Sequence, residues 1–285
     1  MSARTADPLT VNPASSYSAR YNGYSIRCVV KDPEPEVPQY IQDVTNYNCP
    51  RNPITVIDKR DNESYTIQKL ADDNCWMLEN LRTDLVSIPL ATLKGNTNAS
   101  DTTLEYLKGT RIGTVSDQYP TSAVSNWTSG GSYSDPLQYT TDKNMLYSWG
   151  NDFGKAGVYY NVCAASAGSN CYGNGQTYST ADVDPITEDI CPKGWHIPTG
   201  DASGEFQTLY SIYHLNTAFR SATQLPFAGM YYDGTVNNAG SSGYYFTSTT
   251  NTASGVYRAA VGLGTPSFGA VSNTNGNNVR CIVNH

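Results

Sequence analysis

Alternating apolar and polar residues predict several short strands in the first third of the chain. Ile54–Ile57 and Ser64–Leu70 alternate in this way, with a polar turn between them. Cys75–Leu81 follows a second polar turn, Asp72–Asn74. Because period-two patterns bounded by turn residues are typical of half-buried strands, these segments predict a three-strand meander.

A helix is predicted in the second half, directly after a loop rich in proline. The loop Ile190–Thr199 holds a cysteine directly before its first proline, and a tryptophan and a histidine between its two prolines. The two prolines exclude a continuing helix. Asp201 or Ser203 then provides a cap. The helix itself is predicted by apolar residues at i, i+3, i+4 and i+7, which are Phe206, Leu209, Tyr210 and Tyr213.

Strands return after this helix and continue to the end of the chain. Gly243–Thr249, Val256–Val261 and Val279–Val283 have the aliphatic and aromatic composition of strands, and Asn, Ser and Gly clusters separate them. By contrast, residues 84–140 are weakly patterned. They predict a long insertion with one short helix at Thr102–Leu107, and such insertions often lie over a functional face.

The first 39 residues differ from the rest and divide into two parts. Arg20–Val30 matches Thr274–Val283 in Asn-Gly, then an aliphatic residue, then Arg-Cys-aliphatic-Val. Residues 1–31 are therefore expected to be the last strand of a preceding copy, or a strand that completes this one. Residues 32–39 form a proline-rich acidic linker, and residues 40–285 form the main domain.

The composition limits the classes of partner and the cellular compartment. The chain has 285 residues and a net charge of -7, which argues against nucleic acid and anionic membranes as partners. Its seven cysteines include no CxxC pair, so zinc-type spacing is absent. Spread cysteines in an acidic chain rich in Tyr and Asn favour an oxidising compartment, with buried reduced thiols as the alternative. An extracellular or cell-surface location is expected, and a chain without a signal peptide is then expected to be a fragment of a longer exported protein.

Three disulfides are predicted from the positions of the cysteines. Cys191 and Cys281 bracket the predicted helix and strands, so their bond would hold the last strand against the proline-rich loop. Cys49 and Cys75 would join the start and end of the meander, and Cys163 and Cys171 flank a short loop of small residues. Cys28 is then left without a partner in the chain.

Catalytic and metal chemistry are weakly supported by the sequence. His196 is a candidate base near Cys191, but an oxidised cysteine is no nucleophile, and a hydrogen-bonded core histidine is the better interpretation. Calcium could be held by the acidic clusters at 58–62 and 72–74, although both are more simply turns. We therefore expect a protein that is not an enzyme, with no cofactor and no metal site.

A binding surface is better supported, because Tyr, Ser, Gly and Asn dominate the last third. Tyrosine gives rigid contact area and the small polar residues give adaptable hydrogen bonds, as in antibody loops. Each of these residues could also be an ordinary turn or strand residue. The candidate ligand-binding residues are Tyr231, Tyr232, Asn237, Asn238, Tyr257, Ser267, Asn273, Asn275 and Asn277.

Several short motifs occur in an order that resembles a known family. They are Asp58-x-Arg60-Asp61, Cys75-Trp76-Met77-x-Glu79-Asn80-Leu81, Leu146-Tyr147-x-Trp149, Cys191-Pro192-x-Gly194-Trp195-His196-x-Pro198, Ala228-Gly229, Gly243–Thr249 and Val279-Arg280-Cys281. The ordered set resembles the Fibrobacter succinogenes major paralogous domain, a family of bacterial surface proteins. The likeness covers roughly residues 45–283.

The resemblance implies a fold and a range of functions. The family is similar to the C-type-lectin fold in its formylglycine-generating-enzyme-like branch, a loop-rich α+β domain whose chain ends meet in one sheet. Variable proteins of diversity-generating retroelements share this fold and diversify residues near the C-terminus. The expected function is recognition of a protein or glycan at the cell surface, in a form that can be hypervariable. The alternatives are a structural or adhesive surface repeat and an enzyme of the formylglycine-generating kind.

Two features of the sequence depart from the family. The 84–140 stretch is long, and Phe246 stands where the family usually has tryptophan. The calcium lectins' Glu-Pro-Asn or Gln-Pro-Asp triplet is also absent, so sugar binding through calcium is not implied.

Overall fold

The computed structural model divides the chain into two units, Met1–Glu36 and Val37–His285. The residues that it describes are 5–7, 10–11, 36, 38–109, 113–115, 137–140, 142–149, 152–169, 186–201, 203–232, 234–251, 255–262, 267–271 and 275–284. In the first unit these are two short strands, β1 (Thr5–Asp7) and β2 (Thr10–Val11), which pair antiparallel. The predicted strand-like segment around Cys28 lies outside the described residues.

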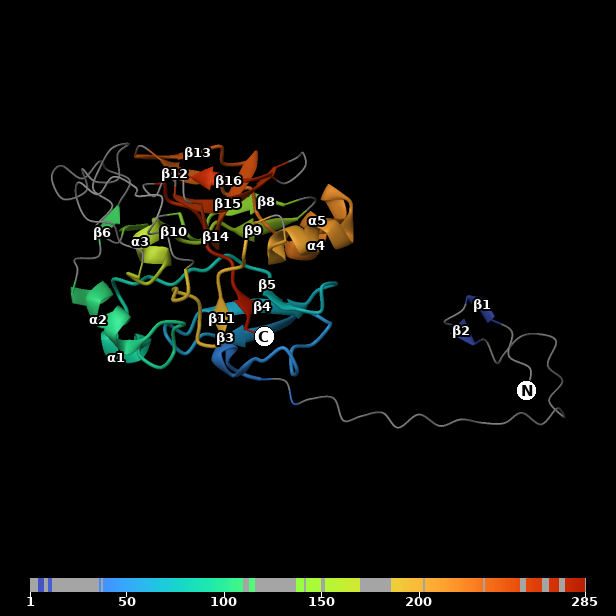
Figure 1. Ribbon diagram of the computed structural model, residues 1–285, viewed down its shortest axis with the longest axis horizontal. Coiled ribbons are helices and arrows are strands. Elements are labelled where there is room, and N and C mark those ends of the chain that lie inside the picture. Colours follow the sequence, from blue (N-terminus) through green and yellow to red (C-terminus); the bar gives the residue numbers. More distant parts are fainter. Residues whose placement is uncertain are drawn as a thin grey trace. The chain divides into compact units, whose positions relative to one another are not determined.

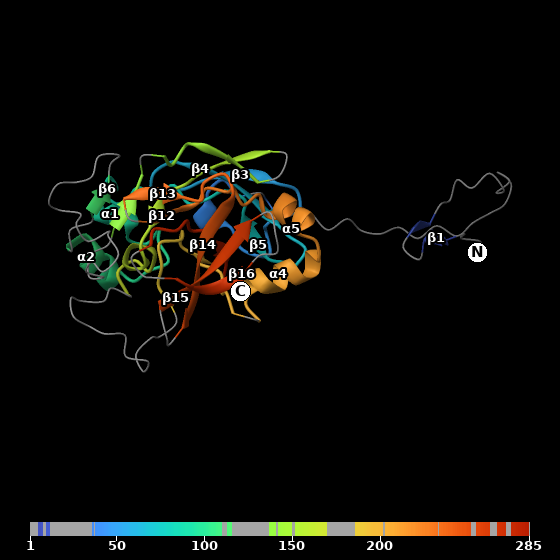
Figure 2. The ribbon, with the colours of Figure 1, turned by 90° about the horizontal axis from the view of Figure 1, so that it is seen from above.

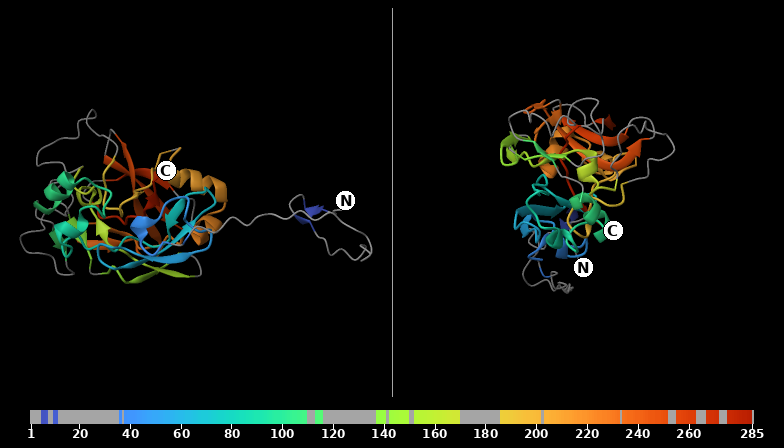
Figure 3. Two further views of the ribbon diagram at one scale, coloured as in Figure 1. Left: turned by 90° about the horizontal axis from the view of Figure 1, so that it is seen from below. Right: turned by 90° about the vertical axis from the view of Figure 1, so that its left-hand side faces the viewer.

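The second unit is a mixed α+β structure built from small, mainly antiparallel sheets and short helices. Its helical elements are η1 (Ile41–Asp43), α1 (Leu90–Leu93), α2 (Asp101–Gly109), α3 (Val162–Ala165), α4 (Glu205–Tyr213) and α5 (Asn216–Thr223). In Figures 1, 2 and 3 the pair α1–α2 and the pair α4–α5 lie at opposite ends of this unit. The α+β class expected from the sequence is therefore confirmed, while the C-type-lectin-like topology stays a prediction.

A five-stranded antiparallel sheet lies in the lower half of the unit in Figure 1. Its strand order is β11 (Trp195–His196), β17 (Ile282–Val283), β5 (Cys75–Met77), β4 (Ser64–Lys69) and β3 (Ile54–Ile57). The meander β3–β4–β5 confirms the period-two prediction. The last strand of the chain lies between β5 and β11, so early and late segments meet in one sheet.

The remaining strands lie mainly in the upper half of Figure 1. They form the pairs β12–β13 and β8–β9, the sheet β14–β15–β16 and the sheet β10–β7–β6. Their bounds are β6 (Gly113–Val115), β7 (Leu137–Tyr139), β8 (Leu146–Ser148), β9 (Phe153–Lys155), β10 (Tyr159–Tyr160), β12 (Met230–Tyr232), β13 (Thr235–Asn237), β14 (Ser242–Asn251), β15 (Gly255–Gly262) and β16 (Ser267–Val271).

The segment Asn275–Val283, which we call the closing ribbon, joins the two halves. Every residue in it is buried. Its backbone exchanges two 2.8 Å hydrogen bonds with Tyr231 on β12, and it bonds further to β14 and β5. Arg280 is 1% exposed and donates to the carbonyl oxygens of Met77, at 3.0 Å, and Thr223, at 2.9 Å. The ribbon therefore contributes backbone and side-chain bonds to both halves of the core.

The predicted insertion 84–140 is in part a structural element of the core. Leu93 of α1 and Leu104 and Leu107 of α2 are fully buried in the largest hydrophobic cluster. Residues 84–109 therefore contribute to the core despite their weak pattern, while the expectation that 84–140 is an insertion over a functional face stays a prediction. The helix predicted at Thr102–Leu107 is confirmed as α2, while residues 116–136 lie outside the described ranges.

Helix α4 begins later than its predicted caps. Its N-cap is Gly204, and neither Asp201 nor Ser203 caps it, so that prediction is wrong. Asp201 instead accepts hydrogen bonds from the backbone N–H and the hydroxyl of Ser203. The first N–H of the helix, that of Glu205, is satisfied by the Thr199 hydroxyl at 2.8 Å. The helix then packs through Phe206, whose ring centroid lies 5.2 Å from that of Trp76.

Candidate functional site

The proline-rich loop and the end of the chain are clamped together by a buried disulfide. Cys191 is bonded to Cys281, and β11 pairs with β17 beside this bond, which confirms the predicted attachment of the last strand. Trp195 is fully buried and its indole N–H donates to the carbonyl oxygen of Ile41 at 2.8 Å. The Cys49–Cys75 disulfide is also confirmed. Cys163 is buried on α3, and its predicted partner Cys171 lies outside the described residues.

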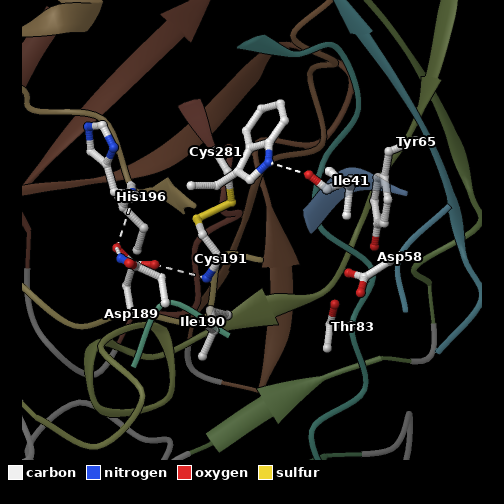
Figure 4. The surroundings of a disulfide bond; sticks show 12 residues. Ile41, Asp58, Tyr65, Thr83, Asp189, Ile190, Cys191, His196 and Cys281 are labelled. Carbon is white, nitrogen blue, oxygen red and sulfur yellow. Dashed lines mark hydrogen bonds between the residues drawn. A yellow bond between two sulfur atoms is a disulfide. The ribbon is translucent and has the colours of Figure 1, made fainter. Parts of the chain in front are cut away.

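The loop around Cys191 is organised by a buried carboxylate, that of Asp189 (Figure 4). Its oxygens accept the backbone N–H of Cys191 at 2.9 Å and of Ile197 at 3.0 Å. Burial raises the pKa of Asp189 to about 6, although these N–H donors oppose the shift. The folded state therefore binds a proton more readily than the unfolded chain between roughly pH 4 and 6, and this group's contribution to stability falls as the pH rises through that range.

His196 lies on the same strand as Trp195 but points away from Asp189 in Figure 4. One ring nitrogen lies 3.0 Å from a carboxylate oxygen of Glu205, and the other lies 2.7 Å from the amide oxygen of Asn284. Burial is the largest single influence and lowers the pKa of His196, but the hydrogen bond and charge of Glu205, the hydrogen bond of Asn284 and the charge of Asp189 together outweigh it and raise the pKa. His196 is hydrogen-bonded, as expected, yet half-buried and not in the core. Because Cys191 is oxidised, it cannot serve as a thiolate nucleophile beside the candidate base His196.

The acidic segments considered for calcium are turns held by their own hydrogen bonds. Asp72 accepts the backbone N–H of Asn74 at 3.2 Å and the indole N–H of Trp76 at 2.9 Å. Asp58 forms a fully buried ion pair with Arg60 at 2.7 Å. Within the described ranges, no group of three or more His, Cys, Asp or Glu side chains gathers as a metal site requires.

The candidate binding residues on β12 and β13 separate into inward and outward sides. Tyr231 is 3% exposed and stacks on Tyr139, with ring centroids 4.4 Å apart. Its neighbour Tyr232 is half-buried, as is Asn237 on β13. Asn237 donates from its amide to the carbonyl oxygen of Tyr232 at 3.0 Å, which stabilises the turn between the two strands.

The outward side continues from β13 into the start of β14. Asn238 is exposed and has a positive φ of 59°, a conformation that asparagine tolerates in turns. Its amide donates to the hydroxyl of Tyr244 at 3.0 Å, and Tyr244 is half-buried while Tyr245 beside it is fully buried. We define the recognition face as Tyr232, Asn237, Asn238 and Tyr244. Tyr244 was missed from the sequence, although the alternation along 243–249 contains the signal.

Two predicted residues on the closing ribbon are buried. Asn275 is 7% exposed and Asn277 is 0% exposed, so neither presents a surface to a ligand in this conformation. Neither amide atom of Asn277 has a hydrogen-bond partner, and nothing in its packing explains an amide there. Of the other candidates, Ser267 is exposed on β16, while the side chain of Tyr257 and the whole of Asn273 lie outside the described part.

The hairpin that carries the recognition face is attached to the core through its backbone. The N–H of Gly229 donates to the carbonyl oxygen of Ser242 at 2.7 Å, and the N–H of Gly240 donates to that of Phe227 at 2.7 Å. On β14, the N–H of Phe246 donates to the closing ribbon at 3.0 Å. Because backbone bonds do not depend on side-chain identity, the outward residues can change without removing these attachments.

Comparisons with known protein families, with curated proteins and with solved structures find no match to this chain. None of the helices in the described ranges combines the length and the apolar character needed to cross a membrane. The chemistry of the site is therefore interpreted from its own residues.

Proposed function

We propose that this protein is a non-enzymatic recognition domain of the cell surface that binds a protein ligand through the recognition face. The observation that carries the proposal is the division of the β12–β14 region into two sides. Buried tyrosines and backbone hydrogen bonds hold the scaffold, while Asn238 is exposed and Tyr232, Asn237 and Tyr244 are half-buried. Tyrosine and asparagine are the residue types that antibody loops use for rigid contacts and adaptable hydrogen bonds.

The disulfides support a location in an oxidising compartment. Both described bonds are buried, and both are of the structural kind that persists in secreted and surface proteins. A C-type-lectin-like topology and a hypervariable surface are part of the same proposal. The position of β17 inside the sheet, next to a segment from the first third of the chain, is consistent with that topology.

A pair of display libraries tests the proposal. One library randomises the four residues of the recognition face, and the control randomises four buried tyrosines, which are Tyr159, Tyr160, Tyr231 and Tyr245. We expect most members of the first library to stay folded with the Cys191–Cys281 bond intact, and binders of a biotinylated protein probe such as lysozyme to be selected from it. Equal loss of folded display in the two libraries, or no binder from the first, would contradict the proposal.

The second candidate is a structural or adhesive surface repeat, and one sequence observation favours it. Arg20–Val30 repeats the residues that the closing ribbon uses, including the arginine and cysteine equivalent to Arg280 and Cys281. A tandem array would contain such a segment at each junction. This candidate predicts concentration-dependent self-association in sedimentation velocity, and a strictly monomeric chain would count against it.

A further inference from the structure

The hairpin of β8 and β9 directs some of its backbone groups outward along both of its edges. Antiparallel strands alternate between pairs that exchange backbone hydrogen bonds and pairs whose N–H and C=O groups point away from the partner strand. The N–H of Trp149 donates to the carbonyl oxygen of Asp152 at 3.1 Å, so the next pair, Ser148 and Phe153, is of the outward kind. Further along β9, the backbone groups of Lys155 point outward for the same reason.

One of these two edges is covered and the other is open. The edge of β8 is covered, because the carbonyl oxygen of Ser148 accepts the N–H of Phe227 at 2.8 Å. Along the edge of β9, no backbone hydrogen bond joins Phe153 or Lys155 to any described segment outside the hairpin. Figure 3 shows the hairpin at the outer edge of the second unit. A strand edge with unpaired N–H and C=O groups is a template on which a further strand can pair.

The outer face of the hairpin carries large apolar side chains. Strand alternation places Leu146, Phe153 and Lys155 on one face and Gly154 on the other. The Gly154 side packs inward, because a Cβ added there would lie 3.4 Å from the ring of Trp149. On the outer face, Leu146 is 58% exposed and Phe153 is 66% exposed. Adjacent exposed apolar side chains beside an open strand edge are typical of a surface that another chain covers.

The sequence of β9 is complementary to itself about Gly154. When two copies of β9 pair antiparallel around a two-fold axis at this glycine, Phe153 of each copy lies opposite Lys155 of the other copy. Both residues have outward backbone groups, so each such pair exchanges its backbone hydrogen bonds. Glycine brings no side chain to the axis. The phenyl ring faces the aliphatic stem and the ammonium of lysine, which is a favourable contact between a cation and an aromatic ring.

We propose that the open edge of β9 is a homodimer interface, at which the β8–β9 hairpins of two copies join into one continuous sheet. A lysine on an edge strand usually hinders pairing. In this register Lys155 meets an aromatic ring and not a second lysine, so it does not oppose the second copy. The next register toward the end of β9 would set the Lys155 side chains of the two copies against each other, and like charges directly opposite are destabilising. The charge therefore selects the register centred on Gly154.

Sedimentation velocity of the full chain over a range of concentrations tests this interface. We expect a monomer–dimer equilibrium with a dissociation constant on the order of 100 µM, because an edge contact of a few residues is among the smallest protein interfaces. Phe153→Lys should raise this constant about tenfold or more, since it sets lysines opposite each other. Phe153→Lys combined with Lys155→Glu should restore the dimer, because each new lysine then lies opposite a glutamate.

Two further variants separate this edge from other contacts. Lys155→Pro removes an outward N–H that the hairpin itself does not use, and it should abolish the dimer. Tyr47→Lys changes an aromatic residue that is 84% exposed and lies outside the hairpin, and it should leave the dissociation constant unchanged. A monomer at all concentrations up to about 1 mM, an equal effect of Tyr47→Lys and Phe153→Lys, or no recovery in the charge-paired double variant would each overturn the proposal.

The outcomes are distinct from those that test the proposed function. The interface contains no residue of the recognition face, so none of these results bears on the display libraries. Self-association that persists in Phe153→Lys would overturn the β9 interface and would favour the structural repeat instead. Self-association that Phe153→Lys removes would support the β9 interface and would not count in favour of the repeat.

Discussion

The two described disulfides should contribute unequally to stability, and the difference follows from the lengths of the loops that they close. Cys191 and Cys281 are separated by 90 residues, and Cys49 and Cys75 by 26. If a disulfide acts by lowering the chain entropy of the unfolded state, these loops correspond to about 4.6 and about 3.5 kcal/mol. The longer loop should therefore contribute about 1.1 kcal/mol more to the free energy of unfolding.

Urea denaturation of two double variants measures this difference. One variant replaces Cys49 and Cys75 by alanine, and the other replaces Cys191 and Cys281. All four cysteines are at most 5% exposed, so the loss of packing around the sulfur atoms is similar in the two variants. The reasoning is refuted if removal of the Cys49–Cys75 bond lowers the free energy of unfolding as much as, or more than, removal of the other bond.

Three further predictions concern single positions. Arg280→Ala should destabilise the protein by about 4 kcal/mol, because it leaves several buried acceptors unpaired. As a control, Arg51→Ala should cost less than about 1 kcal/mol, since the ion pair of Arg51 with Asp73 is exposed. Urea denaturation of the two variants measures the difference. Gly229→Ala should lower the thermal midpoint and cost roughly 2 kcal/mol or more, because φ is +75° and a Cβ would lie 2.3 Å from a backbone oxygen of β13; an unchanged midpoint would contradict this geometry. The raised pKa of His196 predicts that protonated His196 stabilises the folded state. This contribution to the free energy of unfolding is fully present below pH 6.5, the ordinary pKa of histidine, and is lost as the pH rises through the raised pKa. Glu205→Gln should flatten this pH dependence, which urea denaturation at several pH values measures.

The sequence predicted the elements whose pattern is local and strong. The meander from Ile54 to Met77 alternates clearly, and α4 has four apolar or aromatic residues at positions i, i+3, i+4 and i+7. The two disulfides followed from their positions relative to these elements. Helix α5 was not predicted, because Asn216–Thr223 contains a single large apolar residue, Phe219, and the helix depends on packing that residue in the core.

The candidate site was predicted in its composition but only in part in its geometry. Alternation shows that neighbouring residues on β12 face opposite sides, but it does not show which side is buried. Tyr231 faces inward because it stacks on Tyr139, a residue distant in sequence. Asn275 and Asn277 resemble turn residues, yet they are buried because the ribbon that contains them bonds to β10 and β12. These long-range contacts have no local signal.

The closing ribbon also sets the order in which this protein can be made. Translation delivers residues 275–283 after nearly all of the domain has been synthesised, so β5 and β11 have no neighbour between them until then. Until Cys281 has been synthesised, the thiol of Cys191 lacks its native partner and is open to exchange with other thiols. A chain released before residue 275 would therefore lack the strand between β5 and β11 and the partner of Cys191, and it would remain incompletely folded.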